Sequence, residues 1–193
     1  MSVTPATAAS DSAAADISRA TIEAAATRIA PFIIETPLVE SPRLNDKLGI
    51  RLLVKAECLQ HTGSFKLRGA SNAVWSLDDT VKHVVAFSSG NHAQGVARAA
   101  ASRGLQATIV MPKDSPAGKI EGTKAYGGTV ILYDRYTESR EEIGADLATR
   151  KQAHLIKPFD DFRVIAGQGT VGLEIATQAA AKNLTPDAII CCC

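Results

Sequence analysis

Short apolar runs alternate with helical segments along most of the chain, and this order constrains the fold more than any other feature. Apolar runs predict strands at 51–56, 84–87, 108–111, 129–133, 153–156 and 188–192. Helix-compatible segments cover 17–29, 65–77, 91–102, 117–125, 138–151 and 169–182. Apolar strands separated by helices of roughly 10–15 residues are typical of parallel βαβ units covered on both faces. The sequence therefore predicts an α/β protein with open, mostly parallel sheets and helices on both faces.

The two ends of the chain carry separate expectations. Residues 1–15 are rich in Ala, Ser and Thr and lack the basic and apolar regions of a secretory signal, so we expect a disordered tail. At the other end, the predicted strand 188–192 is followed by a single residue. Ligands of open α/β sheets bind at the carboxyl ends of strands, where a domain seldom stops. We therefore expect a truncated polypeptide.

Charge and cysteine content exclude several classes of partner. Lysine and arginine number 21 against 20 acidic residues, so no net field attracts nucleic acid or an acidic membrane. No apolar run reaches the roughly 18–20 residues of a transmembrane helix. Cys58 stands alone and residues 191–193 are adjacent cysteines, which gives neither zinc-ligand spacing nor a disulfide framework. We expect a cytoplasmic protein without a membrane, nucleic-acid or metal site in this chain.

Lys66 stands just after a polar turn, at the start of the predicted helix 65–77. A helix N-terminus carries partial positive charge and disfavours a second cation there. If Lys66 is also shielded from water, both effects lower its pKa and leave a neutral amine that can form a Schiff base with a carbonyl cofactor. A solvated lysine on the first turn of a helix has the same local sequence. Lys66 alone leaves both interpretations open.

A second polar turn, SSGNHAQG at 88–95, joins the predicted strand 84–87 to the helix 91–102. Backbone N–H groups and hydroxyls at such a turn point to one place, which suits a carboxylate or a phosphate. A serine-rich helix cap without a ligand has the same pattern. Because Lys66 occupies a comparable strand-to-helix turn, we expect the two turns to converge on one active-site rim.

Three segments resemble motifs of the fold-type-II pyridoxal-phosphate enzymes, whose fold is that of the tryptophan synthase β chain. QHTGSFKLRGA at 60–70 is similar to the cofactor-lysine motif, SSGNHAQG to the substrate-carboxylate loop, and VIAGQGT at 164–170 to a third motif. They occur in the family's order, and the similarity runs from about residue 17 to the end. The group that the motifs match best is the threonine/serine dehydratases, with serine racemase and 3-hydroxyaspartate dehydratase beside them.

The resemblance implies pyridoxal 5'-phosphate as cofactor and a division into two domains. Residues 16–77 and 159–193 would form a large cofactor domain, incomplete here, and residues 78–158 a small domain that closes over the substrate. The phosphate-binding loop and any divalent-cation site would lie beyond residue 193. The full-length parent is expected to be a homo-oligomer acting on a small amino-acid substrate.

The reaction implied is β-elimination of a 3-hydroxy amino acid such as threonine or serine, which yields a 2-keto acid and ammonia. Alternatives within the family are 3-hydroxyaspartate dehydratase and serine racemase. An inactive ligand-binding fragment that lacks the phosphate loop is an alternative of another class. A plain nucleotide-binding domain is disfavoured, because no Gly-x-Gly-x-x-Gly or Walker pattern is present.

The resemblance also assigns roles to individual residues. Lys66 would form the Schiff base with the cofactor and then act as the base at the substrate Cα. Phe65 would pack near the cofactor ring, with core packing as the alternative. Asn91 would form a hydrogen bond with the 3-oxygen of the cofactor's pyridine ring. The substrate carboxylate would be held by Ser88, Ser89, Gly90, Asn91 and His92; a polar helix cap is the alternative for His92.

Two residues bear on the choice of substrate. Threonine dehydratases commonly carry alanine at the position of Ser89, whereas serine racemase and hydroxyaspartate dehydratase carry serine. The Ser89 hydroxyl would either return a proton on the face opposite Lys66, which is racemisation, or only donate to the carboxylate. Arg140 matches a racemase position near bound substrate and could grip a second carboxylate, which favours 3-hydroxyaspartate. A surface ion pair at i,i+3 or i,i+4 is the alternative.

Overall fold

The computed structural model describes residues 17–191 and confirms the α/β class. Its centre is a four-stranded parallel sheet in the order β5-β4-β3-β6. The strands are β3 (His83–Phe87), β4 (Gln106–Pro112), β5 (Thr129–Tyr133) and β6 (His154–Ile156), connected by α4 (Asn91–Ser102), α5 (Ala117–Ala125) and α6 (Arg140–Arg150). In this part of the chain the predicted elements are all present, and their ends lie within two residues of the predicted ones.

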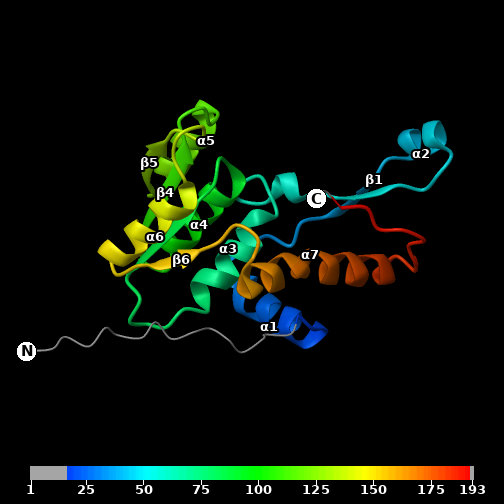
Figure 1. The fold of residues 1–193 in the computed structure, drawn as a ribbon. Helices are drawn as coiled ribbons and strands as arrows, with labels where there is room; N and C mark the ends of the chain where they lie inside the picture. The colour runs from blue at the N-terminus through cyan, green and yellow to red at the C-terminus, as the bar shows by residue number, and fades with distance from the viewer. Residues whose placement is uncertain (1–16, 192–193) are drawn as a thin grey trace, which may run out of the picture.

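Helices cover both faces of this sheet (Figure 1). Side chains alternate across a strand, so neighbouring residues of β3 pack into different layers. Val84 and Ala86 pack in a cluster with α4 and with α3 (Lys66–Trp75), whereas Val85 and Phe87 pack with Leu147 of α6. The continuous apolar runs of the sequence are therefore explained by burial on two sides.

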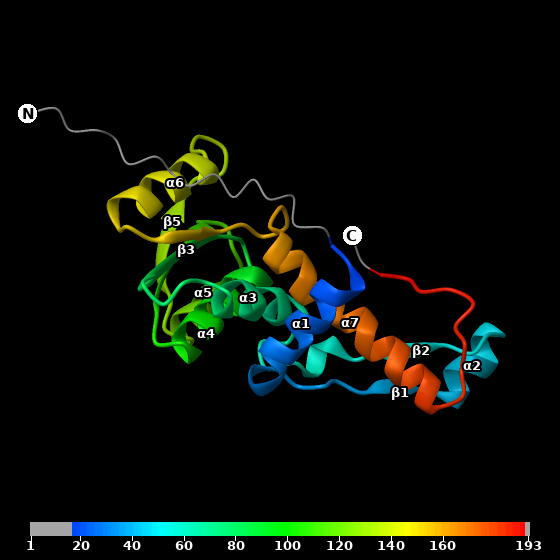
Figure 2. The same ribbon diagram turned by 90° about the horizontal axis from the view of Figure 1, so that it is seen from below.

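The rest of the described chain is built on long helices. Helix α1 (Arg19–Ile29) lies beside α7 (Phe162–Ala181), and α7 runs on past a small antiparallel pair, β1 (Leu38–Glu40) and β2 (Leu53–Lys55) (Figure 2). The short helix α2 (Pro42–Leu48) connects these two strands. Helix α1 begins after Ser18, whose hydroxyl accepts a hydrogen bond from the Thr21 N–H. The sequence also offers Asp16 as an N-cap for the helix predicted at 17–29, and this residue lies outside the described residues.

Two predicted strands differ from the structure. The run 51–56 forms only β2, and β2 pairs antiparallel with β1 instead of joining a parallel sheet. The run 188–192 forms no strand over its described residues, and Ile189 and Ile190 are 66% and 93% exposed. A strand requires a neighbour for its backbone hydrogen bonds, and between residues 17 and 191 no strand lies beside this run.

Helix α7 starts seven residues before its predicted beginning at 169. Asp161 accepts hydrogen bonds from the backbone N–H groups of Arg163 and Val164, which caps the first turn. The glycines of the 164–170 motif therefore lie inside the helix, where Gly167 leaves room for the backbone of α3 and Gly169 for the side chain of Ile22. A Cβ on Gly167 would lie 2.6 Å from both the Arg68 carbonyl oxygen and the Gly69 Cα. The third motif is thus the point at which α7 crosses α3.

Candidate functional site

A cavity of about 410 Å³ opens at the carboxyl ends of β3 and β6. The chain runs from β3 outward to β4 and β5 and then returns to β6 on the other side of β3. Loops that follow β3 and β6 therefore diverge, which creates the crevice where ligands bind in open α/β sheets. The cavity is lined by Lys66, residues 88–92, Pro116, Lys119 and Pro158. The structure thus brings the two predicted turns together.

Three helices begin at this cavity. Lys66 is the first residue of α3, Asn91 is the first of α4, and Pro116 immediately precedes α5. Each helix N-terminus adds partial positive charge and free N–H groups. Of the described residues that line the cavity, none is acidic and two are lysines. The cavity is therefore suited to an anionic ligand.

The Lys66 side chain lines the cavity and is half-buried. Its Nζ donates a hydrogen bond to the Pro158 carbonyl oxygen at 3.3 Å and lies 5.3 Å from the centre of the Phe65 ring. Burial lowers the pKa of the Lys66 amine. Phe65 itself is half-buried at the helix start and does not belong to the buried core. The amine is thus shielded from water and held against an apolar ring.

The 88–92 loop presents different groups to the cavity. The Ser88 hydroxyl accepts the Gly90 N–H at 3.2 Å, which fixes the turn, while Ser89 is exposed. His92 is only 2% exposed, and neither ring nitrogen has a hydrogen-bond partner among residues 17–191. Burial, with a smaller contribution from the Lys66 charge, lowers the pKa of His92 to about 4. The Ile156 backbone opposes this only in part, because it lies outside hydrogen-bond geometry.

Lys119 is a cavity residue that the sequence reasoning missed. Its Nζ lies 2.6 Å from Oδ1 of Asn91, on the first turn of α5. Like Lys66, Lys119 stands in the first turn of a predicted helix, and this pattern in the sequence could have identified it.

Arg140 lies in a neighbouring cavity of about 420 Å³, not in the Lys66 cavity. Of the described residues, only Ser88 and Ser89 line both cavities. The Arg140 guanidinium stacks 5.2 Å from the centre of the Phe87 ring and pairs with Glu141 at 2.7 Å, which lowers the pKa of that carboxyl. This partner is the next residue in the sequence, so the expected i,i+3 or i,i+4 pair is not the one that forms.

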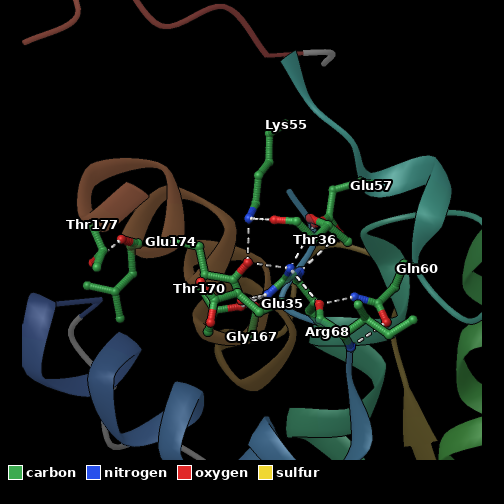
Figure 3. Close-up of polar contacts among 12 residues, drawn as sticks. Glu35, Thr36, Lys55, Glu57, Gln60, Arg68, Gly167, Thr170, Glu174 and Thr177 are labelled. Atoms are coloured by element: carbon green, nitrogen blue, oxygen red, sulfur yellow. Dashed lines mark hydrogen bonds and ion pairs between the residues drawn. The ribbon is translucent and has the colours of Figure 1, made fainter. Parts of the chain in front are cut away.

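A buried ion network holds the segment that carries Lys66 (Figure 3). Arg68 is fully buried and donates to both oxygens of Glu57, at 2.9 and 2.8 Å, and to both oxygens of Glu174, at 2.6 and 2.8 Å. Burial alone would lower the pKa of the guanidinium, but the two carboxylates outweigh it and raise the pKa. Arg68 thereby ties both ends of the turn before α3 to α7.

The second cation of the network is Lys55 of β2. Its Nζ donates to Glu174 at 2.6 Å and to the Thr36 carbonyl oxygen at 2.5 Å. Burial opposes the charge on Glu174, yet Arg68 and Lys55 together hold the pKa of this carboxyl below its usual value. Two cations thus face two carboxylates in a nearly dry setting, where losing one partner leaves an uncompensated charge.

The described residues fit pyridoxal phosphate, the cofactor that the motifs imply. An aldehyde requires a neutral amine, and burial favours this form at Lys66 by lowering the pKa of the amine. The anionic oxygens of the cofactor and of an amino acid require donors, and the three helix N-termini supply them. The buried hydroxyls of Thr62 and Ser64, close to Lys66 in sequence, also have no partner within 17–191. No group of His, Cys, Asp or Glu in the described part of the chain could hold a metal ion.

Comparison with known proteins decides the family. The pyridoxal-phosphate dependent enzymes match residues 29–193. The chain belongs to this family. The prediction of pyridoxal phosphate as cofactor is thereby confirmed, and so is the resemblance to fold-type-II enzymes.

Three relatives of the chain carry different names. An L-threo-3-hydroxyaspartate ammonia-lyase of Saccharomyces cerevisiae is 49% identical over 153 residues, which cover 78% of this chain and 47% of the relative. A serine racemase of Oryza sativa subsp. indica is 45% identical over 164 residues, covering 84% and 48%. The solved threonine deaminase of T.th. is 48% identical with a TM-score of 0.82, covering 88% and 54%. The chain therefore spans about half the length of the proteins it matches.

Proposed function

We propose that this chain carries the reacting lysine of a pyridoxal-phosphate-dependent ammonia-lyase that acts on 3-hydroxy amino acids such as threonine or serine. The observation that supports this most strongly is the half-buried Lys66 amine, which faces the 88–92 loop where three helix N-termini meet. The net reaction gives a 2-keto acid and ammonia. It needs no oxidant, because the water lost on elimination is regained on hydrolysis.

Pyridoxal phosphate, when bound, supplies an electron sink for the pair released at the substrate Cα. The Lys66 amine accepts the Cα proton in its neutral form, which burial favours. Backbone N–H groups and hydroxyls at 88–92 hold the substrate carboxylate, and Asn91 donates to the ring 3-oxygen. Holding base and substrate together in this way can supply roughly 7–11 kcal/mol of the barrier reduction. Residues 78–158 close over the substrate as a small domain and exclude water.

The test is chemical trapping on Lys66. The 193-residue chain is incubated with pyridoxal phosphate, reduced with borohydride and mapped by mass spectrometry, with Lys66→Ala and Lys124→Ala treated in parallel. We expect the label on Lys66, retained in Lys124→Ala and lost in Lys66→Ala. Label on another lysine, or none, would overturn the assignment and favour an inactive ligand-binding fragment. We also expect weak cofactor binding and little turnover from this chain; dehydratase activity equal to that of a full-length relative would contradict that expectation.

A 3-hydroxyaspartate substrate is the second candidate, and the Arg140 cavity favours it. Arg135 and Arg140 line this cavity beside Ser88 and Ser89, together with Glu138 and Glu141. A second carboxylate extending from a substrate held by the loop would replace Glu141 as the partner of Arg140. We expect Arg140→Ala in the full-length parent to reduce the hydroxyaspartate rate and to spare serine and threonine. Arg150→Ala, on the exposed side of the same helix, is the control. An unchanged hydroxyaspartate rate would exclude Arg140 as a carboxylate clamp.

Serine racemisation is the third possibility, and it rests on Ser89. The Ser89 side chain is exposed and lines both cavities, so its hydroxyl is free to reach a substrate. Ser89→Ala should then abolish racemisation and leave elimination intact.

We further propose that the full-length protein is a cytoplasmic homo-oligomer. Within the described residues, no helix is long and apolar enough to span a membrane.

A further inference from the structure

We infer that Lys119 is a positioning residue that sets the amide orientation of Asn91, so that Asn91 presents its NH₂ group to the ring 3-oxygen of the cofactor. The inference rests on the proposed function, in which Asn91 bonds that oxygen.

The contacts of Lys119 determine which amide atom faces it. Its Nζ lies 2.6 Å from Oδ1 of Asn91 and 3.2 Å from Oε1 of Gln94, one turn further along α4. An ammonium group has three donors and no acceptor, so the amide atom nearest to it must be oxygen. The Asn91 NH₂ group is consequently turned away from Lys119, and no residue between 17 and 191 accepts a hydrogen bond from it. Asn91 is left with a free donor at the cavity.

Local electrostatics do not explain why a lysine occupies this position. Lys119 lies on the first turn of α5, where the helix dipole disfavours a cation and the turn has no acidic residue to offset it. No carboxylate among the described residues pairs with it. Lys124, on the same helix, shows the ordinary alternative, because it pairs with Glu121 at 2.9 Å. The cation at 119 is therefore placed for its contacts with α4.

Gly122 completes the arrangement. A Cβ on Gly122 would lie 2.1 Å from Nε2 of Gln94, so the Gln94 amide nitrogen occupies the space that the glycine leaves. Gln94 is thereby held with its nitrogen toward Gly122 and its oxygen toward Lys119. The Lys119 ammonium is thus held between the amide oxygens of Asn91 and Gln94 on α4, and these two contacts define its position.

The consequence concerns an anionic ring oxygen. With Lys119 present, this oxygen meets the Asn91 NH₂ group, behind which a positive charge lies. Without the cation, the Asn91 amide is free to rotate and to present its oxygen, which repels the ligand. Lys119 orients Asn91 in addition to adding positive charge to the cavity, so its removal should weaken ligands that carry the 3-oxygen more than anionic ligands that lack it.

Equilibrium binding to two cofactors tests this dependence. Binding of pyridoxal phosphate and of its 3-deoxy analogue is measured by fluorescence titration of the wild-type chain and of Lys119→Met, Lys119→Arg and Lys124→Met. We expect Lys119→Met to weaken the binding of pyridoxal phosphate about five- to tenfold, which corresponds to about 1–1.4 kcal/mol, and to weaken the binding of the analogue by no more than about twofold. Lys119→Arg keeps a donor-only cation and should bind within about twofold of wild type. Lys124→Met should match wild type.

Equal weakening of both ligands by Lys119→Met, or no weakening, would overturn the inference while the trapping of pyridoxal on Lys66 still stood. Failure of the wild-type chain to be trapped on Lys66 would instead remove the proposed function, and this inference with it. Urea unfolding of each variant shows whether weaker binding comes from a lost contact or from a destabilised fold. Lys119→Arg is a second variant, in which the charge is kept and the structure is disturbed less. Gly122→Ala, which displaces Gln94, should repeat the selective loss in weaker form.

Discussion

The crossing of α3 and α7 at Gly167 is the packing contact on which the position of Lys66 depends. A methyl group at 167 would lie 2.6 Å from the Arg68 carbonyl oxygen, 2.6 Å from the Gly69 Cα and 2.8 Å from the Asn72 Cβ. Ordinary contacts begin at about 3.4 Å, and two of these three atoms belong to the backbone of α3. The helices must therefore separate to accommodate alanine, because no flexible side chain can move aside.

The magnitude follows from two opposing effects. Overpacking costs about 1–3 kcal/mol, and rigid backbone contacts place this site at the upper end. Alanine has a helix propensity about 1 kcal/mol better than glycine, which offsets part of the cost. We expect Gly167→Ala to lower the free energy of unfolding by about 2 kcal/mol. Gly172, on the same helix, has nothing within 4 Å of a built Cβ, so Gly172→Ala should raise the free energy of unfolding by up to about 1 kcal/mol.

Urea unfolding followed by circular dichroism measures both variants. The change in the free energy of unfolding should be negative for Gly167→Ala and positive for Gly172→Ala, a difference of about 3 kcal/mol. The dependence of the free energy of unfolding on urea concentration should be similar in the two variants. If the two substitutions shift the transition in the same direction and by the same amount, the backbones do not touch at Gly167. The explanation of the 164–170 motif as a helix crossing would then be wrong.

Two further predictions concern stability. The pKa of His92 is about 4 in the fold and about 6.5 in the unfolded chain, so the unfolded state binds the proton first as the pH falls. The free energy of unfolding should therefore drop by about 3 kcal/mol between pH 7 and pH 4. In His92→Gln, urea unfolding at each pH should show a smaller drop over this range. If the free energy of unfolding of His92→Gln depends on pH as strongly as that of the wild type, the ring of His92 is not buried in its neutral form. Asp161→Ala removes the cap of α7 and should cost about 1 kcal/mol in the same assay, whereas a neutral result would show that this cap is dispensable.

Sequence patterns predicted the parallel sheet because its central strands, β3 and β4, are buried on both faces and therefore apolar almost throughout. The same rule failed at 188–192, since an apolar run records a tendency to be buried and not the presence of a neighbouring strand. It also failed to reveal β1, which is short and mostly exposed. The convergence of Lys66 with the 88–92 loop was predicted from two polar strand-to-helix turns, but its physical cause is different: β2 lies outside the parallel sheet, and the two turns meet because α3 packs directly against α4.

Long-range charge pairing was beyond sequence reasoning. Arg68 is separated from Glu174 by more than a hundred residues, and nothing local distinguishes it from a solvated arginine. Its burial follows only from the packing of α3 against α7. Lys119 is an intermediate case: its place on a helix N-terminus is visible in the sequence, but its contact with Asn91 requires α4 and α5 to be packed together.

The proposed chemistry depends on the neutral, nucleophilic form of the Lys66 amine, which burial favours by lowering its pKa before any ligand binds. Competitive labelling of the cofactor-free chain with trace acetic anhydride across a range of pH, read at each lysine by mass spectrometry, gives the pKa of Lys66 directly. Because burial lowers it, the midpoint should lie below the ordinary value of 10.5. A midpoint at 10.5 or above would mean that Lys66 is a solvated ammonium, and the proposed chemistry would lose its nucleophile.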